Sequence, residues 1–176
     1  MNSSEPKKVL LCDMDGVLVD LLPTWLAVYG RDSGEWIHVD EILEYNHEQF
    51  VTYPAIFWKS LGEALRDAPP VVGSSTFDEL CEDYDTYIVT YAHHSAPNAV
   101  EAKLAWLARY FPDFDRDRVI FTKHKHLVRG DILIEDSQQN IIEWQRANSW
   151  CQESFLVKQP YNRDGVTWKE IVEVLI

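Results

Sequence analysis

Short apolar runs recur along the chain, and polar or turn-forming residues flank each of them. They predict buried strands at residues 9–12, 87–89, 119–121 and 132–134, with a weaker fifth strand at 155–157. Runs that are apolar at every position are typical of parallel strands covered by helices on both faces.

Helical periodicity lies between the predicted strands. In the segment SAPNAVEAKLAWLARYF, one buried face is predicted to carry Val100, Leu104, Leu107 and Phe111, and Pro112 marks the end of the helix. The segments SQQNIIEWQRAN and VTWKEIVEVLI follow a similar rhythm. Strands that alternate with helices predict an α/β fold, a Rossmann-like doubly wound parallel sheet.

Residues 21–72 interrupt this alternation. The segment is rich in aromatic residues, contains no convincing strand and ends near a pair of prolines, which favours a turn. We therefore expect an α/β core made of residues 1–20 and 73–176, with residues 21–72 inserted after the first strand as a small helical unit.

Composition and charge narrow the classes of function. The 176 residues are 46% hydrophobic, which is enough to bury a sizeable core in one domain with an insertion. The net charge of -13 disfavours a polynucleotide partner, because binding to a nucleic-acid backbone needs a basic face. A small anion can still bind where a metal ion or a local cation reverses the sign.

The cysteines favour a reducing compartment. Cys12, Cys81 and Cys151 are odd in number, widely spaced and form no CxxC pair. No apolar stretch approaches the length of a membrane span, and no signal core follows the N-terminus. We expect a cytoplasmic protein with no membrane partner; its oligomeric state, a homodimer included, stays open.

Polar residues collect where the predicted strands end. In open parallel sheets, ligands bind outside the carboxyl ends of the strands. The side chains expected at this rim are Asp13, Asp15, Thr90, Lys125, Glu135 and Asp136.

This set of side chains suits a hard cation. Clustered carboxylates favour Mg²⁺, whereas zinc is disfavoured because the histidines lack ligand spacing linked to a cysteine pair. A magnesium ion between Asp13 and Asp136 would offset the repulsion among the acids. An aspartate in that setting can attack phosphorus, and a second acid two residues further on can transfer protons.

Taken together, the motifs resemble those of a known protein superfamily. DMDGVLVD resembles the first motif of the haloacid dehalogenase superfamily, the DxDG phosphatases. The other motifs follow in order, with Thr90 at the end of YIVT, Lys125 in TKHKH, and the acidic pair of ILIEDS. The similarity covers essentially the whole chain.

The resemblance implies a role for each rim residue. Asp13 would be the nucleophile and Asp15 the general acid and base. Thr90, Tyr91 and Lys125 would hold the phosphoryl oxygens, and Lys125 fits the lysine motif better than the neighbouring Lys123.

The resemblance also implies a magnesium site. Its ligands would be the carboxylates of Asp13 and Asp136 and the backbone carbonyl of Asp15. Glu135 would lie behind these ligands or contact the ion through a water molecule.

Within the superfamily, the chain is similar to the 5'(3')-deoxyribonucleotidase family. The similarity lies in DMDGVLVD, in Phe57-Trp58, in KHLVRGDILIEDS and in QPYNR late in the chain. It implies a Mg²⁺-dependent hydrolysis of (deoxy)nucleoside monophosphates through an aspartyl-phosphate. Two departures stand out: Tyr91 replaces a small residue, and Glu135 replaces the first aspartate of an Asp-Asp pair.

The resemblance makes the inserted unit a cap over the active site. Phe57 and Trp58 either contact the substrate or fill the interior of the cap, and both interpretations stay open. We expect Trp25, Trp36 and Tyr45 to fill that interior, because a small helical unit has little else to bury.

Other functions are compatible with parts of the pattern. A phosphatase or phosphomutase acting on a phosphosugar or another metabolite would share the DxDG and EDS motifs. A non-catalytic binding protein could keep the fold, although such proteins usually lose the nucleophile or a metal ligand, and both are present here.

Overall fold

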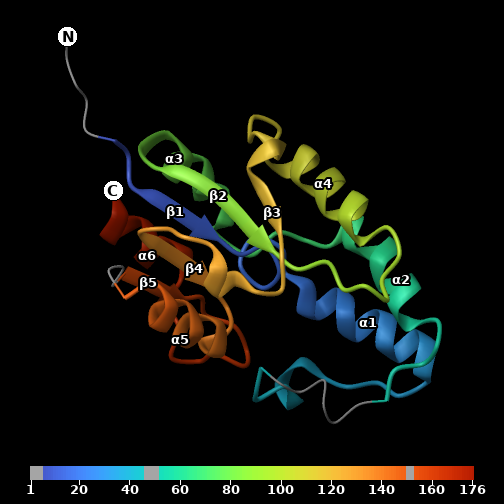
Figure 1. Cartoon of the computed structure of the whole chain (residues 1–176). Helices are drawn as coiled ribbons and strands as arrows, with labels where there is room; N and C mark the ends of the chain where they lie inside the picture. The colour runs from blue at the N-terminus through green and yellow to red at the C-terminus, as the bar shows by residue number, and fades with distance from the viewer. Residues whose placement is uncertain (1–5, 46–51, 150–152) are drawn as a thin grey trace.

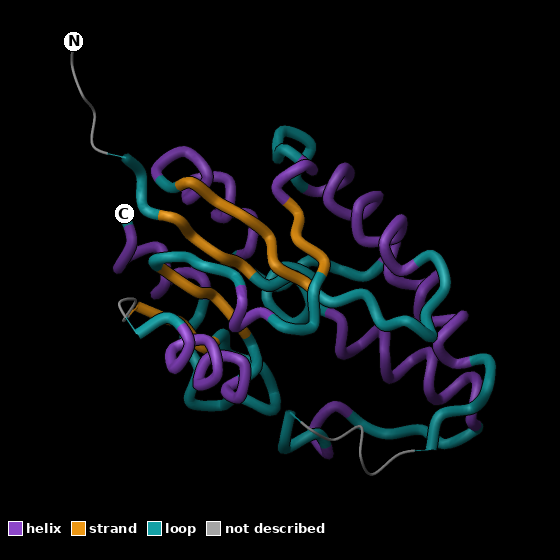
Figure 2. Tube along the Cα trace, in the orientation of Figure 1, coloured by secondary structure: helices purple, strands orange, loops and turns teal. Residues whose placement is uncertain are grey.

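The computed structural model describes residues 6–45, 52–149 and 153–176, so Cys151 lies outside the described residues (Figure 1). One parallel sheet runs in the order β3-β2-β1-β4-β5 (Figure 2). Its strands are β1 (Val9–Cys12), β2 (Asp85–Thr90), β3 (Val119–Phe121), β4 (Ile132–Glu135) and β5 (Glu153–Leu156). The predicted α/β fold is confirmed.

The strands meet in a register that brings their carboxyl ends together. Cys12 pairs with Ile88 of β2 on one side and with Ile134 of β4 on the other. β2 begins two residues before its apolar run, because its pairing with β1 continues back to Asp85 opposite Val9. Residues that follow β1, β2 and β4 therefore share one edge of the sheet.

Helices cover both faces of the sheet, as the apolar strands require. Leu10 and Cys12 pack with apolar side chains of α3, α4 and α6, whereas Leu11 packs with Ile141 and Trp144 of α5. The bounds of these helices are α3 Phe77–Asp83, α4 Ala99–Tyr110, α5 Gln138–Ala147 and α6 Trp168–Leu175.

Helix α4 is rotated relative to the predicted face. Val100 is 40% exposed, so its expected burial was wrong. Trp106 is fully buried and its indole N–H donates to the Ala68 carbonyl at 2.7 Å. Since the largest side chain of the helix points inward, its neighbours on that side are buried with it: Ala99, Ala102, Lys103 and Leu107.

The inserted region is helical. Figure 1 shows α1 (Leu21–Ser33) and α2 (Phe57–Ala64) beyond the arrowheads of the strands. The two helices share an apolar cluster of their own. Its buried members are Leu22, Trp25, Leu26, Val28, Tyr29, Ile42, Phe57 and Leu61.

Of the three aromatic residues expected inside the insertion, only Trp25 is buried there. Trp36 is 73% exposed, and its ring lies against Gly30 of α1, where an ideal Cβ would be 2.4 Å from the nearest ring atom. Tyr45 is 40% exposed. The expectation was therefore wrong for Trp36 and Tyr45.

The chain enters and leaves the insertion along two adjacent segments. The amide of Asp20 donates to the Pro69 carbonyl, and the amide of Val71 donates to the Leu18 carbonyl, both at 2.8 Å. These two segments pair antiparallel at Val19 and Pro70, which closes the insertion next to the end of β1. Within the described ranges, no helix combines the length and the apolarity that crossing a membrane requires.

Candidate active site

A cavity of about 780 Å³ lies between the carboxyl ends of the strands and the inserted helices. Side chains from both parts of the chain line it, among them Asp13, Asp15, Trp58, Tyr91, Lys125 and Asp136. The sheet edge supplies acids and lysines, and α1 and α2 supply apolar and aromatic surface.

Asp13 follows β1 and is held by a buried lysine. The Nζ atom of Lys125 lies 2.7 Å from Asp13 Oδ1 and 2.7 Å from Glu135 Oε2. Glu135 Oε1 accepts the backbone amides of Asp136 and Ser137, each at 3.1 Å. Both oxygens of Glu135 therefore have partners, and this side chain orients Lys125 between the two strand ends.

Burial and charge shift the pKa values of these groups. Burial and the neighbouring Glu135 raise the pKa of Asp13 to about 7. Burial alone would lower the pKa of Lys125, but Asp13 and Glu135 outweigh it and hold that pKa above its usual range. Burial would raise the pKa of Glu135, but the ammonium of Lys125 holds it below its ordinary value. Without a metal ion, the site thus favours the ionised form of Glu135 and disfavours the ionised form of Asp13.

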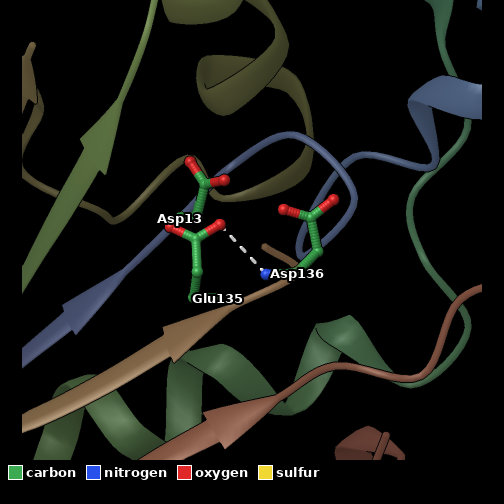
Figure 3. Close-up of side chains that lie close together, drawn as sticks. All are labelled: Asp13, Glu135 and Asp136. Atoms are coloured by element: carbon green, nitrogen blue, oxygen red, sulfur yellow. Dashed lines mark hydrogen bonds between the residues drawn. The ribbon is translucent and has the colours of Figure 1, made fainter. Parts of the chain in front are cut away.

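Carboxylates from two strand ends approach one another closely. One oxygen each from Asp13, Glu135 and Asp136 lies within 4.8 Å of the others, and Figure 3 shows the three side chains together. Burial, followed by the charge of Glu135, raises the pKa of Asp136 well above its ordinary value. Asp136 Oδ1 is buried and has no hydrogen-bond partner among the residues that the structure describes.

The donor set and the charge balance fit a divalent cation. Four carboxylates, including that of Asp15, face the ammonium groups of Lys103 and Lys125. When all four carboxylates are ionised, this cluster carries two net negative charges, which one divalent ion would balance. Carboxylate oxygens are the ligands that Mg²⁺ takes in proteins. Asp136 Oδ1 is a buried carboxylate oxygen of this kind, with no hydrogen-bond partner among the described residues.

Lys103 is a site residue that the sequence pattern did not identify. It lies on the inner side of α4, is 2% exposed, and its Nζ is 2.5 Å from Asp15 Oδ2. The same ammonium donates to Thr90 Oγ1 at 3.0 Å. Because an ammonium can only donate, the hydroxyl of Thr90 keeps its own hydrogen for another acceptor.

The signal for Lys103 was present in the sequence. Ala99, Ala102, Lys103 and Trp106 follow the spacing of one helix face. A face set by Trp106, instead of by Val100 and Leu104, would have placed a lysine among buried positions, where unpaired lysines are rare.

Phe57 and Trp58, the adjacent residues of α2 that resemble the family, lie in different surroundings. Phe57 is fully buried among Trp25, Tyr29 and Tyr53, and it is absent from the lining of the cavity. Trp58 lines the cavity and stacks on His93, with ring centroids 4.0 Å apart and an interplanar angle of 4°.

The segment after β2 contributes further aromatic surface. Tyr91 lines the cavity, and the ammonium of Lys123 lies 6.0 Å from the centroid of its ring. His93, from the same segment, joins the stack with Trp58, a contact that the sequence pattern did not indicate. Burial, followed by the charges of His94 and Lys123, lowers the pKa of His93.

Comparisons with known proteins find matches over nearly the whole chain. Residues 7–175 match the family described as "5' nucleotidase, deoxy (Pyrimidine), cytosolic type C protein". Proteins named 5'(3')-deoxyribonucleotidase from Bacillus subtilis strain 168 and from Bacillus phage SPbeta are each 29% identical over 178 residues, covering 97% of this chain and 99% of the relative.

Solved structures share the fold. A protein described as a HAD-hydrolase from Bacillus subtilis, bound to magnesium, superposes with a TM-score of 0.63 at 13% identity, covering 97% of this chain and 99% of that one. A HAD family hydrolase from Deinococcus radiodurans with bound phosphate and sodium gives a TM-score of 0.57 at 17% identity, with 98% and 96% covered.

The chain belongs to the deoxynucleotidase family that its sequence matches. It is therefore a phosphomonoester hydrolase, and its fold is that of the HAD hydrolases, as the resemblance of its motifs implied.

Proposed function

From this membership we infer that the protein is a Mg²⁺-dependent 5'(3')-deoxyribonucleotidase, which hydrolyses (deoxy)nucleoside monophosphates through an aspartyl-phosphate on Asp13. The observation that carries the proposal is the position of Asp13, a buried carboxylate beside Lys125 at the base of a cavity with aromatic walls. A nucleoside monophosphate has a phosphate group that suits Asp13 and Lys125, and a base that suits the aromatic walls.

The first half of the reaction transfers the phosphoryl group to the protein. A carboxylate oxygen of Asp13 attacks phosphorus, and the bond from phosphorus to the nucleoside oxygen breaks. We propose that Asp15 gives a proton to the departing oxygen, a role supported by its Oδ1, which has no hydrogen-bond partner among the described residues. Lys125 and Tyr91, which line the cavity, would hold the phosphoryl oxygens, together with Thr90, whose hydroxyl is buried behind the lining beside Lys103.

The second half returns the protein to its starting state. Asp15 accepts a proton from a water molecule, whose oxygen attacks the phosphorus of the aspartyl-phosphate. The bond from phosphorus to Asp13 breaks, and inorganic phosphate leaves. The same side chain therefore acts first as acid and then as base.

We propose that Asp13, Asp136 and the backbone carbonyl of Asp15 hold the magnesium ion. When bound, the ion would screen the charge between the nucleophile and the phosphate. The bound magnesium named for one structural neighbour and the phosphate named for another support this assignment. Glu135 holds Lys125 in place and lies beside the proposed ligands.

The aromatic surface supports the nucleotide part of the proposal. Trp58 and His93 form a flat stacked pair in the cavity wall, and stacking of a base on an aromatic side chain contributes about 1–3 kcal/mol. Phe57 serves instead as interior packing for the helices that present Trp58. We propose that residues 21–72 act as a cap, since closure over the cavity would exclude water from the reacting groups.

The free thiols of Cys12 and Cys81 support placement of the protein in the cytoplasm, where thiols stay reduced.

Replacement of Asp13 tests the chemistry. Asp13→Asn removes the charge that attacks phosphorus while keeping the shape, so phosphate release from deoxynucleoside monophosphates should fall to background. Chelation of divalent ions by EDTA should abolish the activity of the unaltered protein, and added Mg²⁺ should restore it. Full activity in either case would contradict the corresponding part of the proposal.

A substrate panel tests the nucleotide assignment separately. Deoxynucleoside 5'- and 3'-monophosphates should be hydrolysed faster than phosphosugars of similar size. The opposite order would leave the phosphatase mechanism in place and favour a phosphosugar or another metabolite as substrate.

A further inference from the structure

The turn after β5 contacts both loops that carry the acids. Gln159 donates from its side chain to the Gly16 carbonyl at 2.6 Å, next to Asp15. Asn162 donates from its side chain to the backbone carbonyl of Asp136. The amide of Asn162 also donates to the Gln159 carbonyl at 2.9 Å, so these contacts come from one closed turn. The turn lies in QPYNR, the segment to which the sequence motifs assign no chemical task.

Tyr161 is the residue of this turn that meets a carboxylate. Its hydroxyl donates to Asp136 Oδ2 at 2.6 Å. The same oxygen lies against Gly16, because an ideal Cβ on that glycine would be 2.1 Å from it. Asp136 Oδ2 is therefore held on one side by a hydrogen bond and on the other by backbone.

Holding one oxygen determines the direction of the other. Asp136 Oδ1 is buried and has no hydrogen-bond partner among the residues that the structure describes. The carboxylate belongs to the group whose oxygens gather within 4.8 Å, beside Asp13. A carboxylate oriented in this way presents one free oxygen at a fixed position to a cation.

A phenol is well suited to this position. A tyrosine hydroxyl is a neutral donor, so it orients Asp136 without adding a positive charge beside the proposed cation. The ring is also fixed by packing: its edge meets Tyr45 of the inserted region, with centroids 5.6 Å apart and an interplanar angle of 77°.

We propose that Tyr161 is a positioning residue of the metal site, which orients the free oxygen of Asp136 through its hydroxyl. This inference rests on the magnesium site of the proposed function and adds a residue to it. Hydrogen bonds to carboxylate ligands typically strengthen metal affinity by about 10- to 100-fold.

The test removes the hydroxyl group from each of two tyrosines by replacement with phenylalanine. Tyr161→Phe removes the hydroxyl and keeps the ring that packs on Tyr45. Tyr84→Phe is the matched control, because the Tyr84 hydroxyl donates to the Leu175 carbonyl at 2.7 Å, in a part of the fold that does not line the cavity. Dissociation constants for Mg²⁺, and for Mn²⁺ as a second probe, are measured by calorimetry, with the melting temperature of each metal-free protein beside them.

The inference predicts that Tyr161→Phe weakens Mg²⁺ binding by about 10- to 100-fold, while Tyr84→Phe binds as tightly as the unaltered protein. Affinity in Tyr161→Phe within about two-fold of the unaltered protein would overturn the role of Tyr161 and leave the metal site standing. Loss of affinity only in proportion to a lower metal-free melting temperature would assign Tyr161 a structural role. Failure of the unaltered protein to bind either ion would overturn the metal site itself and this inference with it.

Discussion

The ammonium of Lys103 lies 2.5 Å from the carboxylate of Asp15, although the two residues come from a helix and from a loop on opposite sides of the inserted region in sequence. The pair joins the proposed acid and base to α4. Through Thr90, the same ammonium also reaches the end of β2.

Replacement of Lys103 by methionine should reduce kcat/KM by at least about 100-fold, within the range that positioned acid–base groups contribute. Methionine keeps most of the side-chain volume but leaves Asp15 and Thr90 without their shared donor. Steady-state kinetics give the result, and circular dichroism establishes that the fold is retained. Lys169→Met on the exposed side of α6 is the control and should match the unaltered protein, since its partner Glu173 is also exposed. Equal activity in Lys103→Met and Lys169→Met would remove Lys103 from the site.

Gly16 permits the close contact between the loop after β1 and Asp136. Its φ is +71°, and an added Cβ would lie 2.1 Å from Asp136 Oδ2 and 2.7 Å from the Tyr161 hydroxyl. Gly16→Ala should therefore abolish both Mg²⁺ binding and phosphatase activity.

Gly34 provides a matched control for that prediction. It has a similar φ of +79° at the end of α1, but an added Cβ there meets nothing within 4 Å. Gly34→Ala should cost about 1–2 kcal/mol of stability from backbone strain alone and keep full activity. If both alanine variants keep activity, the contact between Gly16 and Asp136 has no role in the site.

The neighbouring residues Phe57 and Trp58 should respond differently to alanine. Trp58→Ala should raise KM for deoxynucleoside monophosphates by roughly 5- to 150-fold, which corresponds to a stacking contribution of about 1–3 kcal/mol. Glycerol phosphate, which has no base, should be hydrolysed as before. Phe57→Ala should instead lower the free energy of unfolding by about 3–5 kcal/mol, because it empties a buried position in the insertion. A change in KM for glycerol phosphate as large as that for nucleotides would argue against base stacking on Trp58.

The raised pKa of Asp13 links stability to pH and metal. Burial and Glu135 raise this pKa from 3.8 to about 7, so between these values the folded protein binds more protons than the unfolded chain. The stability of the metal-free protein should consequently fall as pH rises through that window. A divalent ion compensates the ionised carboxylates, so the gain in melting temperature from saturating Mg²⁺ should be larger at about pH 8 than at about pH 5. Melting curves with and without Mg²⁺ measure this gain, and a gain that shrinks as pH rises would contradict the assignment.

Much of the fold follows from local pattern. The strands were predictable because apolar runs between turn-forming residues signal buried parallel strands, and the residues after them, from Asp13 to Asp136, necessarily meet at one edge. The bounds of β2 were less predictable, because its first residues are polar and are held in the sheet by pairing with β1.

Several contacts could not be predicted from the spacing of residues. Lys103 is different, because its burial follows from the sequence once the size of Trp106, and not Val100 and Leu104, sets the buried face of α4. Trp36 is exposed and contacts Gly30 on the surface of α1, a position that no local spacing signals. The hydrogen bond from Tyr161 to Asp136 joins two loops that follow different strands, so the sequence could mark QPYNR but could not assign its task.

The central claim is that the phosphoryl group passes through Asp13. Rapid acid quench of the protein during turnover of a deoxynucleoside monophosphate with Mg²⁺, followed by peptide mass spectrometry, locates the phosphoryl group directly. The account predicts a phosphoryl adduct on the peptide that contains Asp13, labile in base and absent in Asp13→Asn. Steady turnover without any adduct on that peptide, or an adduct that persists in Asp13→Asn, would contradict it.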